Sequence, residues 1–283
     1  MTPDRRLTPA NGRVAHRSLR GVVQAAHYVS GDWAAVAEPL ADVLDMPGGK
    51  RVRQAIYGER LLVLERREGW AFAQAERDDY VGYVAEAALA ADRVASHWVS
   101  AAATHLYRHP DIKRGEVAAL TLGSRLTVVG SAQGPVAGRF VETDQGLFAI
   151  AQHLCPIGQW ASDPVSVATQ FLGTPYLWGG NSRSGIDCSG LVQTALLACG
   201  ISCPGDSDLQ MHGVGGEVPA GAAPQRGDLL FWDGHVALVA GPDRIIHAAG
   251  HFMAVVEEGL AGAVARILAQ GGGSLLAHKR VGG

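Results

Sequence analysis

The sequence lacks long apolar runs and a strong excess of charge of either sign. No stretch approaches the roughly 20 apolar residues that a membrane-spanning helix needs, so membrane insertion is not expected. With a formal net charge of −3, the chain has no general electrostatic attraction for nucleic acid or for an anionic membrane. A hydrophobic fraction of 47% and a charged fraction of 18% predict a folded globular protein.

Cysteine is scarce as well. The four cysteines, at positions 155, 188, 199 and 203, are too few for a disulfide scaffold in a chain of 283 residues. No apolar segment of a secretory signal follows the basic N-terminal residues, so we expect a cytoplasmic location with reduced thiols, and the cell envelope is the alternative. No histidine or cysteine cluster has metal-ligand spacing, so neither a metal nor another cofactor is expected.

The length of the chain predicts two or three domains. Residues 1–21 carry five arginines and are predicted to form a flexible basic tail. Residues 22–93 and 94–157 contain short strand candidates separated by glycine and aspartate turns, which predicts small all-β domains. Near residue 161 the sequence pattern changes from short strand candidates to helix candidates followed by strands. Residues 161–283 are therefore expected to form a separate domain.

The all-β part shows an internal repeat. Leu44-Asp45-Met46-Pro47 is echoed 63 residues later by Tyr107-Arg108-His109-Pro110, which favours two copies of one unit. One irregular β-sandwich is the alternative. The strand candidates of the first copy are Val52–Ile56, Leu61–Glu65, Trp70–Gln74 and Tyr80–Val84; the second copy is more diverged and ends on Gly146–Ile150.

The last 120 residues predict an α+β domain. Asp163 and Pro164 form a helix start, because an acceptor side chain precedes a proline, and Gly173 ends that helix. A second helix runs from Cys188 to Gly200, and the residues through Gln225 are expected to be loop. The strand candidates that follow are Asp228–Trp232, His235–Ala240, Arg244–Ala248 and a last one around Ser274–His278.

Cys188, in GIDCSG, lies at the predicted start of the second helix. A thiol acts as a nucleophile only as the thiolate. The partial positive charge of a helix N-terminus stabilises a thiolate, so we expect a lowered pKa for Cys188. A cysteine on the buried stripe of the helix would instead be a small hydrophobe, which fits Cys199 but not Cys188.

Two histidines can supply the base that such a nucleophile needs. His235 begins a strand after the Asp233-Gly234 turn, and His247 lies 12 residues further on, near the end of the next strand. If the strands pair as a hairpin, His235 can take the proton of Cys188 while His247 fixes the tautomer of His235. Each histidine taken alone is more often a strand-end residue without a role, but the three residues in this order favour catalysis.

These motifs resemble those of known families. QAIYGERLLVLERREGWAFAQAERDDYVGYV is similar to a bacterial SH3 domain, and a second, diverged copy follows it. FLGTPYLWGGNSRSGIDCSGLVQ, RGDLLFWDGHVALV and IIHAAG resemble the nucleophile, base and third-residue motifs of the NlpC/P60 family. The resemblance implies two SH3-like barrels followed by an α+β papain-like peptidase domain, and a γ-D-glutamyl-diamino acid bond as the substrate bond.

The NlpC/P60 resemblance also implies roles for single residues. Cys188 would attack the scissile carbonyl, His235 would move the proton and His247 would orient His235. Tyr176, in TPYLWGG, matches a tyrosine near the oxyanion pocket, although it could also be a packed aromatic. Asp187 and Ser189 flank the nucleophile as candidate substrate-binding residues, and Asp187 could serve only as an N-cap.

A narrower subgroup joins two bacterial SH3 domains to this peptidase domain and acts on free murein peptides. The resemblance of this chain to that subgroup implies hydrolysis that releases L-Ala-γ-D-Glu and requires the free amine of L-alanine. Asp206 and Ser207, in GDSD, stand at the amine-binding positions, and Tyr80, in DDYVGYV, matches a tyrosine that narrows the site. Asp206 could equally be a turn residue and Tyr80 a barrel residue.

Other functions stay open at this stage. The chain could be an exported peptidoglycan hydrolase whose SH3-like domains bind the wall, an acyltransferase on the same core, or a catalytically inactive binding module. The sequence predicts neither the diamino acid, which could be meso-diaminopimelate or lysine, nor the oligomeric state.

Overall fold

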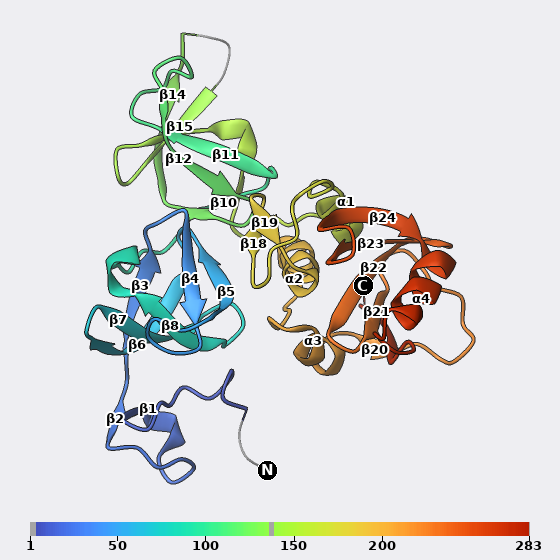
Figure 1. Cartoon of the computed structure of the whole chain (residues 1–283). Helices are drawn as coiled ribbons and strands as arrows, with labels where there is room; N and C mark the ends of the chain where they lie inside the picture. Colours follow the sequence, from blue (N-terminus) through green and yellow to red (C-terminus); the bar gives the residue numbers. More distant parts are fainter. Residues whose placement is uncertain (1–3, 136–138, 283) are drawn as a thin grey trace. The chain divides into compact units, whose positions relative to one another are not determined.

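The computed structural model describes residues 4–135 and 139–282 (Figure 1). The chain divides into two compact units, Met1–Ile157 and Gly158–Gly283. Most regular structure is β-strand, and the helices are few and short. Within the described ranges, no helix has the length and hydropathy required to cross a membrane.

A seven-stranded antiparallel sheet forms the first half of unit 1. Small and β-branched side chains fill its core, among them Ala34, Val36 and Val63. All four predicted strands are confirmed, with ends that shift by one or two residues. In sheet order the strands are β5 (Arg51–Ile56), β4 (Leu40–Leu44), β8 (Val81–Ala85), β7 (Trp70–Ala75), β6 (Arg60–Arg67), β3 (Asp32–Val36) and β9 (Leu89–Ala91), with a 3-10 turn at Glu86–Ala88.

The N-terminal segment, predicted as a flexible basic tail, contains regular structure. Its strand β1 (Val14–His16) pairs in parallel with β2 (His27–Val29), and a 3-10 turn, Arg17–Leu19, lies between them. Val14 packs against Phe72 in the first sheet. The arginines of this segment flank an apolar pair, Val14 and Ala15, that is buried, and its flexibility stays a prediction.

The second half of unit 1 has its own sheets and core. Val99, Leu106 and Leu120 form this core, to which Tyr57 from the first half is added. A second SH3-like domain stays a prediction. One sheet holds β13 (Arg125–Leu126), β10 (His97–Val99) and β17 (Leu154–Pro156), and the other holds β12 (Glu116–Thr121), β11 (Ala103–Tyr107), β16 (Phe148–Ile150), β15 (Arg139–Thr143) and β14 (Val128–Gln133), with a 3-10 turn at Ala151–His153.

Unit 2 is an α+β unit built on a six-stranded sheet. In sheet order the strands are β20 (Gly216–Glu217), β25 (Ala277–Arg280), β21 (Leu229–Trp232), β22 (His235–Gly241), β23 (Arg244–Ala249) and β24 (Ala254–Gly259). A small hairpin joins β18 (Asn181–Ser182) to β19 (Gly185–Ile186). The helices are α1 (Pro164–Thr169), α2 (Cys188–Ala198), α3 (Ser207–Gly213) and α4 (Leu260–Ala269).

The unit departs from the predicted elements at several places, among them the last strand, which is Ala277–Arg280 where Ser274–His278 was predicted. The helix that starts at Asp163 ends at Thr169, before the predicted Gly173. The predicted loop through Gln225 contains α3 and β20. The strand β24 and the helix α4 have no counterpart in the prediction.

The core of unit 2 fixes where α2 begins. All four residues of β21 are buried, and α2 packs along β22 and β23. The apolar stripe predicted for α2, including Leu191 and Leu196, is fully buried. This packing holds the first turn of α2 beside the first residues of β22, so the predicted nucleophile and the predicted base share one end of the unit.

Candidate active site

Asp187 organises the turn that carries the nucleophile. Its carboxylate accepts hydrogen bonds from the backbone N–H of Gly190 at 2.7 Å, from that of Gly179 at 2.8 Å and from the Ser189 hydroxyl at 3.1 Å. These contacts are those of a helix N-cap, and they join the glycine turn before α2 to the first turn of the helix. Substrate contacts of Asp187 and Ser189 stay predictions.

Cys188 is the first residue of α2 and is only 7% exposed. Its Sγ lies 3.9 Å from the carbonyl oxygen of Gly234, and the Val236 N–H also points to the sulfur. The thiol therefore faces the two residues on either side of His235.

The pKa of Cys188 contradicts the prediction of an activated thiolate. Burial, and after it the charge of Asp187, raise this pKa to about 12, although the backbone N–H groups of Val236, Ser189 and Cys188 act in the lowering direction. The helix N-terminus cannot offset burial, because the carboxylate of Asp187 already occupies that end of the helix. The resting thiol is protonated.

The two histidines meet as the hairpin predicts. His235 Nε2 and His247 Nδ1 are 2.8 Å apart, on neighbouring antiparallel strands β22 and β23. Burial lowers the pKa of His235 to about 3, with further lowering by His247 and Arg266. Burial and Arg266 lower the pKa of His247 to about 4. Both imidazoles are neutral at pH 7.

Two residues that the sequence analysis missed complete the cluster. Glu258, near the end of β24, has its Oε1 2.8 Å from His247 Nε2. Arg266, on α4, donates from Nη2 to the same Oε1. A signal for them existed: Leu260, Ala263 and Ile267 have helical spacing directly after the strand pattern AVVEEG. Among the described residues, no group of three or more His, Cys, Asp or Glu is arranged to hold a metal ion.

Tyr176 lies on the loop that leads to the nucleophile. Its backbone N–H donates to the Met253 carbonyl at 2.9 Å, and it forms a parallel bridge with Ile186. Burial raises the pKa of Tyr176, and the charges of Cys188 and Asp187 act in the same direction. The phenol is therefore protonated and can donate a hydrogen bond close to the sulfur.

Asp206 and Ser207 lie at the start of α3, and both are half-buried. Gln210, which is fully buried, connects this helix to the nucleophile turn. Its Nε2 donates to the Ser189 carbonyl at 2.9 Å and to the Pro204 carbonyl at 3.0 Å. The structure thus brings the start of α3 to the first turn of α2, while recognition of an amine stays a prediction.

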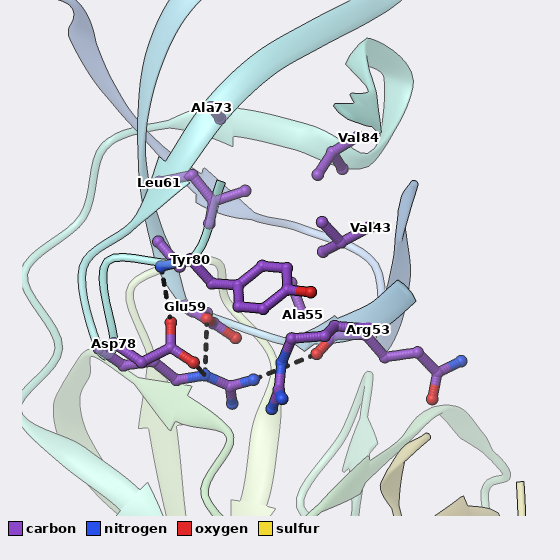
Figure 2. A pocket seen from close by; sticks show the side chains of 12 residues that line it. Val43, Arg53, Ala55, Glu59, Leu61, Ala73, Asp78, Tyr80 and Val84 are labelled. Carbon is purple, nitrogen blue, oxygen red and sulfur yellow. Dashed lines mark hydrogen bonds and ion pairs between the residues drawn. The ribbon is translucent and has the colours of Figure 1, made fainter. Parts of the chain in front are cut away.

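Tyr80 belongs to unit 1, where Figure 2 shows it beside Arg53 and Asp78 in a small pocket lined by both apolar and charged side chains. The Arg53 guanidinium lies 5.3 Å from the centre of the Tyr80 ring, and the Tyr80 N–H donates to Asp78 Oδ1 at 3.2 Å. In the same pocket Arg77 Nε pairs with Glu59 Oε1 at 3.0 Å. These contacts fit the alternative that Tyr80 has a structural role within the SH3-like domain. A contribution of Tyr80 to the substrate site stays a prediction.

Comparison with known proteins identifies the family of this chain. Residues 173–262 match the NlpC/P60 family, and residues 43–89 match the bacterial dipeptidyl-peptidase Sh3 domain. A gamma-D-glutamyl-L-lysine dipeptidyl-peptidase of Bacillus subtilis is 30% identical over 217 residues, which are 69% of this chain and 71% of that protein. The chain belongs to the NlpC/P60 peptidase family.

Matches to other relatives span a smaller share of the relative's own length. Dipeptidyl-peptidase 6 of Lysinibacillus sphaericus is 38% identical over 99 residues, 35% of this chain and 36% of that protein. Two solved structures share the fold. An NlpC/P60 family protein from Bacillus cereus has a TM-score of 0.72 at 20% identity and covers 88% of this chain and 99% of its own. An NlpC/P60 endopeptidase from Photobacterium damselae subsp. piscicida has a TM-score of 0.58 at 13% identity, covering 87% and 70%.

Proposed function

We propose that the protein is a cysteine peptidase that hydrolyses murein-derived peptides between γ-D-glutamate and the diamino acid. The observation that carries the proposal is the convergence of Cys188, at a helix start, with the hydrogen-bonded pair His235 and His247. A nucleophile, a base and an orienting group are the parts that acyl transfer through a thioester needs. The bond is taken from the name of the Bacillus subtilis relative.

In the first step, Cys188 Sγ attacks the scissile carbonyl carbon and its proton passes to His235. Since His235 Nε2 is directed at His247, Nδ1 is the nitrogen available to take this proton. The resting pair is neutral because burial raises the pKa of the thiol and lowers that of the imidazole. Proton transfer therefore accompanies formation of the C–S bond, as in general-base catalysis.

The negative charge that develops on the substrate oxygen needs hydrogen-bond donors. As the first helical residue, Cys188 has a backbone N–H without an intrahelical acceptor, and we assign it to this oxyanion. The protonated phenol of Tyr176 is the second donor. His235 then gives the proton to the departing amine, and a water activated by the same histidine hydrolyses the thioester.

The proposal extends to recognition of a free L-alanine amine. Asp206 would accept from the ammonium group together with Ser207. Unit 2 suits a cationic group, since residues 161–283 hold 10 acidic and 6 basic side chains. An enzyme that requires this amine would act on released peptides, which fits murein recycling in the cytoplasm.

The test is hydrolysis of L-Ala-γ-D-Glu-meso-diaminopimelate, and of its L-lysine counterpart, by the wild-type protein and by Cys188→Ala. We expect L-Ala-γ-D-Glu and the free diamino acid from the wild type, and no turnover by the variant. Cys199→Ala is the matched control, because Cys199 follows the last turn of the same helix and should leave the rate unchanged. Equal rates for the wild type and Cys188→Ala would contradict the proposal. Cleavage of purified sacculi instead of the free peptides would favour an exported wall hydrolase.

A further inference from the structure

The site continues beyond His247 to a carboxylate and a guanidinium that no step described so far uses. Because β23 and β24 are antiparallel and His247 lies opposite Val256, Glu258 projects from the same face of the sheet as His247. Its neighbour Glu257 points to the other face, is exposed, and pairs with Arg244 at 2.5 Å. Two adjacent glutamates on one strand thus have opposite environments.

Arg266 holds Glu258 in place from a different element. The helix α4 packs Ala263 and Ile267 into the core of unit 2, which fixes Arg266 beside the end of β24. The guanidinium pairs with Glu258, donates from Nη1 to Gln270 Oε1 at 3.3 Å and lies 5.1 Å from the Phe252 ring centre. Glu258 and Arg266 are both less than one-fifth exposed, so solvent screens the pair weakly.

The acceptor character of Glu258 determines the protons along the chain of hydrogen bonds. An ion-paired carboxylate can only accept, so His247 must donate from Nε2. A neutral His247 then has a lone pair on Nδ1, which accepts from His235 Nε2–H. The remaining nitrogen of His235, Nδ1, is left without a proton.

We infer that Glu258, held by Arg266, is the positioning residue that sets the tautomer of both histidines and so keeps His235 Nδ1 ready to accept the Cys188 proton. The opposite tautomers would direct a proton from His235 Nδ1 toward the thiol and abolish general-base catalysis. The inference rests on the proposed function for the direction of catalysis, whereas the tautomers themselves do not depend on any substrate. Glu258 touches neither Cys188 nor the reacting atoms in this scheme and acts only through His247.

The first measurement is nitrogen NMR of the imidazole groups in the full chain, with ring ¹⁵N labels. In the wild type we expect protonated Nε2 and unprotonated Nδ1 at both His235 and His247 at pH 7. In Glu258→Met, which removes the acceptor, we expect His247 to lose its fixed tautomer and His235 to follow it. In Glu257→Gln, the matched control on the same strand, the wild-type pattern should remain. Unchanged tautomers in Glu258→Met would overturn the inference.

The second measurement separates positioning from folding. Glu258→Gln keeps an oxygen acceptor at the same place, so we expect it to retain the tautomers and most of the activity even if Glu258→Met folds poorly. For tripeptide hydrolysis, we expect Glu258→Met to lower kcat at least about tenfold with little change in KM. Equal rates in both variants, whether high or low, would contradict the assignment. If the wild type shows the expected tautomers but hydrolyses no tripeptide, the proposed function fails and the tautomer assignment stands.

Discussion

Cys188 and His235 are neutral partners in the resting site, and their environments rather than their identities decide this. The thiol is buried beside a carboxylate, and the imidazole is buried beside a second imidazole and a nearby guanidinium. Each of these surroundings disfavours the charged form. The proposed chemistry therefore requires that the thiol proton is transferred to His235 in the transition state of the attack. We expect a normal solvent isotope effect on kcat/KM as its kinetic signature.

A prediction at the residue scale concerns alkylation of Cys188 by iodoacetamide. Because burial raises the pKa of this thiol to about 12, its alkylation rate should rise about tenfold per pH unit and still be rising above pH 9. Peptide mapping by mass spectrometry separates Cys188 from the other three cysteines, and Cys188→Ala identifies its peptide. A rate that levels off at or below neutral pH would show a preformed thiolate and contradict this description.

At the scale of elements, some features of the site follow from local sequence. The Asp187 N-cap, the start of α2 and the strands β21 to β23 depend on short-range chemistry, and all were predictable. The pairing of His235 with His247 followed from their spacing and one assumed hairpin. Local rules were sufficient because these contacts lie within a helix turn or between consecutive strands.

Other features depend on contacts between elements that are distant in sequence or lack local signals. The helix α3 spans only Ser207–Gly213, and its N-cap residue Asp206 makes no side-chain cap hydrogen bond, unlike Asp163 and Asp187 before α1 and α2. Glu258 becomes part of the site only because α4 brings Arg266 to it and β23 brings His247. Most of the N-terminal arginines are exposed, and the packing of Val14 between them depends on Leu64, Phe72 and Val81, which lie far away in the sequence.

A prediction at this scale concerns Gln210, which connects α3 to the nucleophile turn. Gln210→Leu removes two side-chain hydrogen bonds, to the Ser189 and Pro204 carbonyls, from a buried position between α3 and α2. We expect the free energy of unfolding to fall by about 1–3 kcal/mol, as measured by urea denaturation. Gln170→Leu, at an exposed position in the same unit, should change it by less than about 0.5 kcal/mol. Equal effects of the two substitutions would rule out the structural role of Gln210.

For the whole molecule, stability should depend on pH through buried groups of two kinds. His235 and His247 have folded pKa values of about 3 and 4 against an ordinary 6.5, so the unfolded chain binds their protons first as the pH falls. Their contribution is present above pH 6.5 and is lost as the pH drops toward 4. Burial opposes ionisation of Asp228, but hydrogen bonds from Arg280 and His278 lower its pKa to about 2. Its contribution is lost only below its ordinary value of 3.8.

The corresponding prediction compares urea unfolding at pH 7 and pH 5. His247→Gln should lose less stability over this interval than the wild-type protein, because one buried imidazole no longer resists protonation. His212→Gln, which changes an exposed histidine in unit 2, should keep the wild-type dependence. If His247→Gln and the wild type lost the same amount, burial of neutral His247 would not be the source of the pH dependence.

The most direct test of the proposed activity compares two substrates for the intact protein: free L-Ala-γ-D-Glu-meso-diaminopimelate and the same peptide with its alanine amine blocked by N-acetylmuramic acid. Products are identified by mass spectrometry, and Cys188→Ala provides the background. We expect L-Ala-γ-D-Glu and free diaminopimelate from the unblocked peptide alone. Cleavage of neither peptide, or cleavage of both at equal rates, would contradict the proposed amine-dependent peptidase.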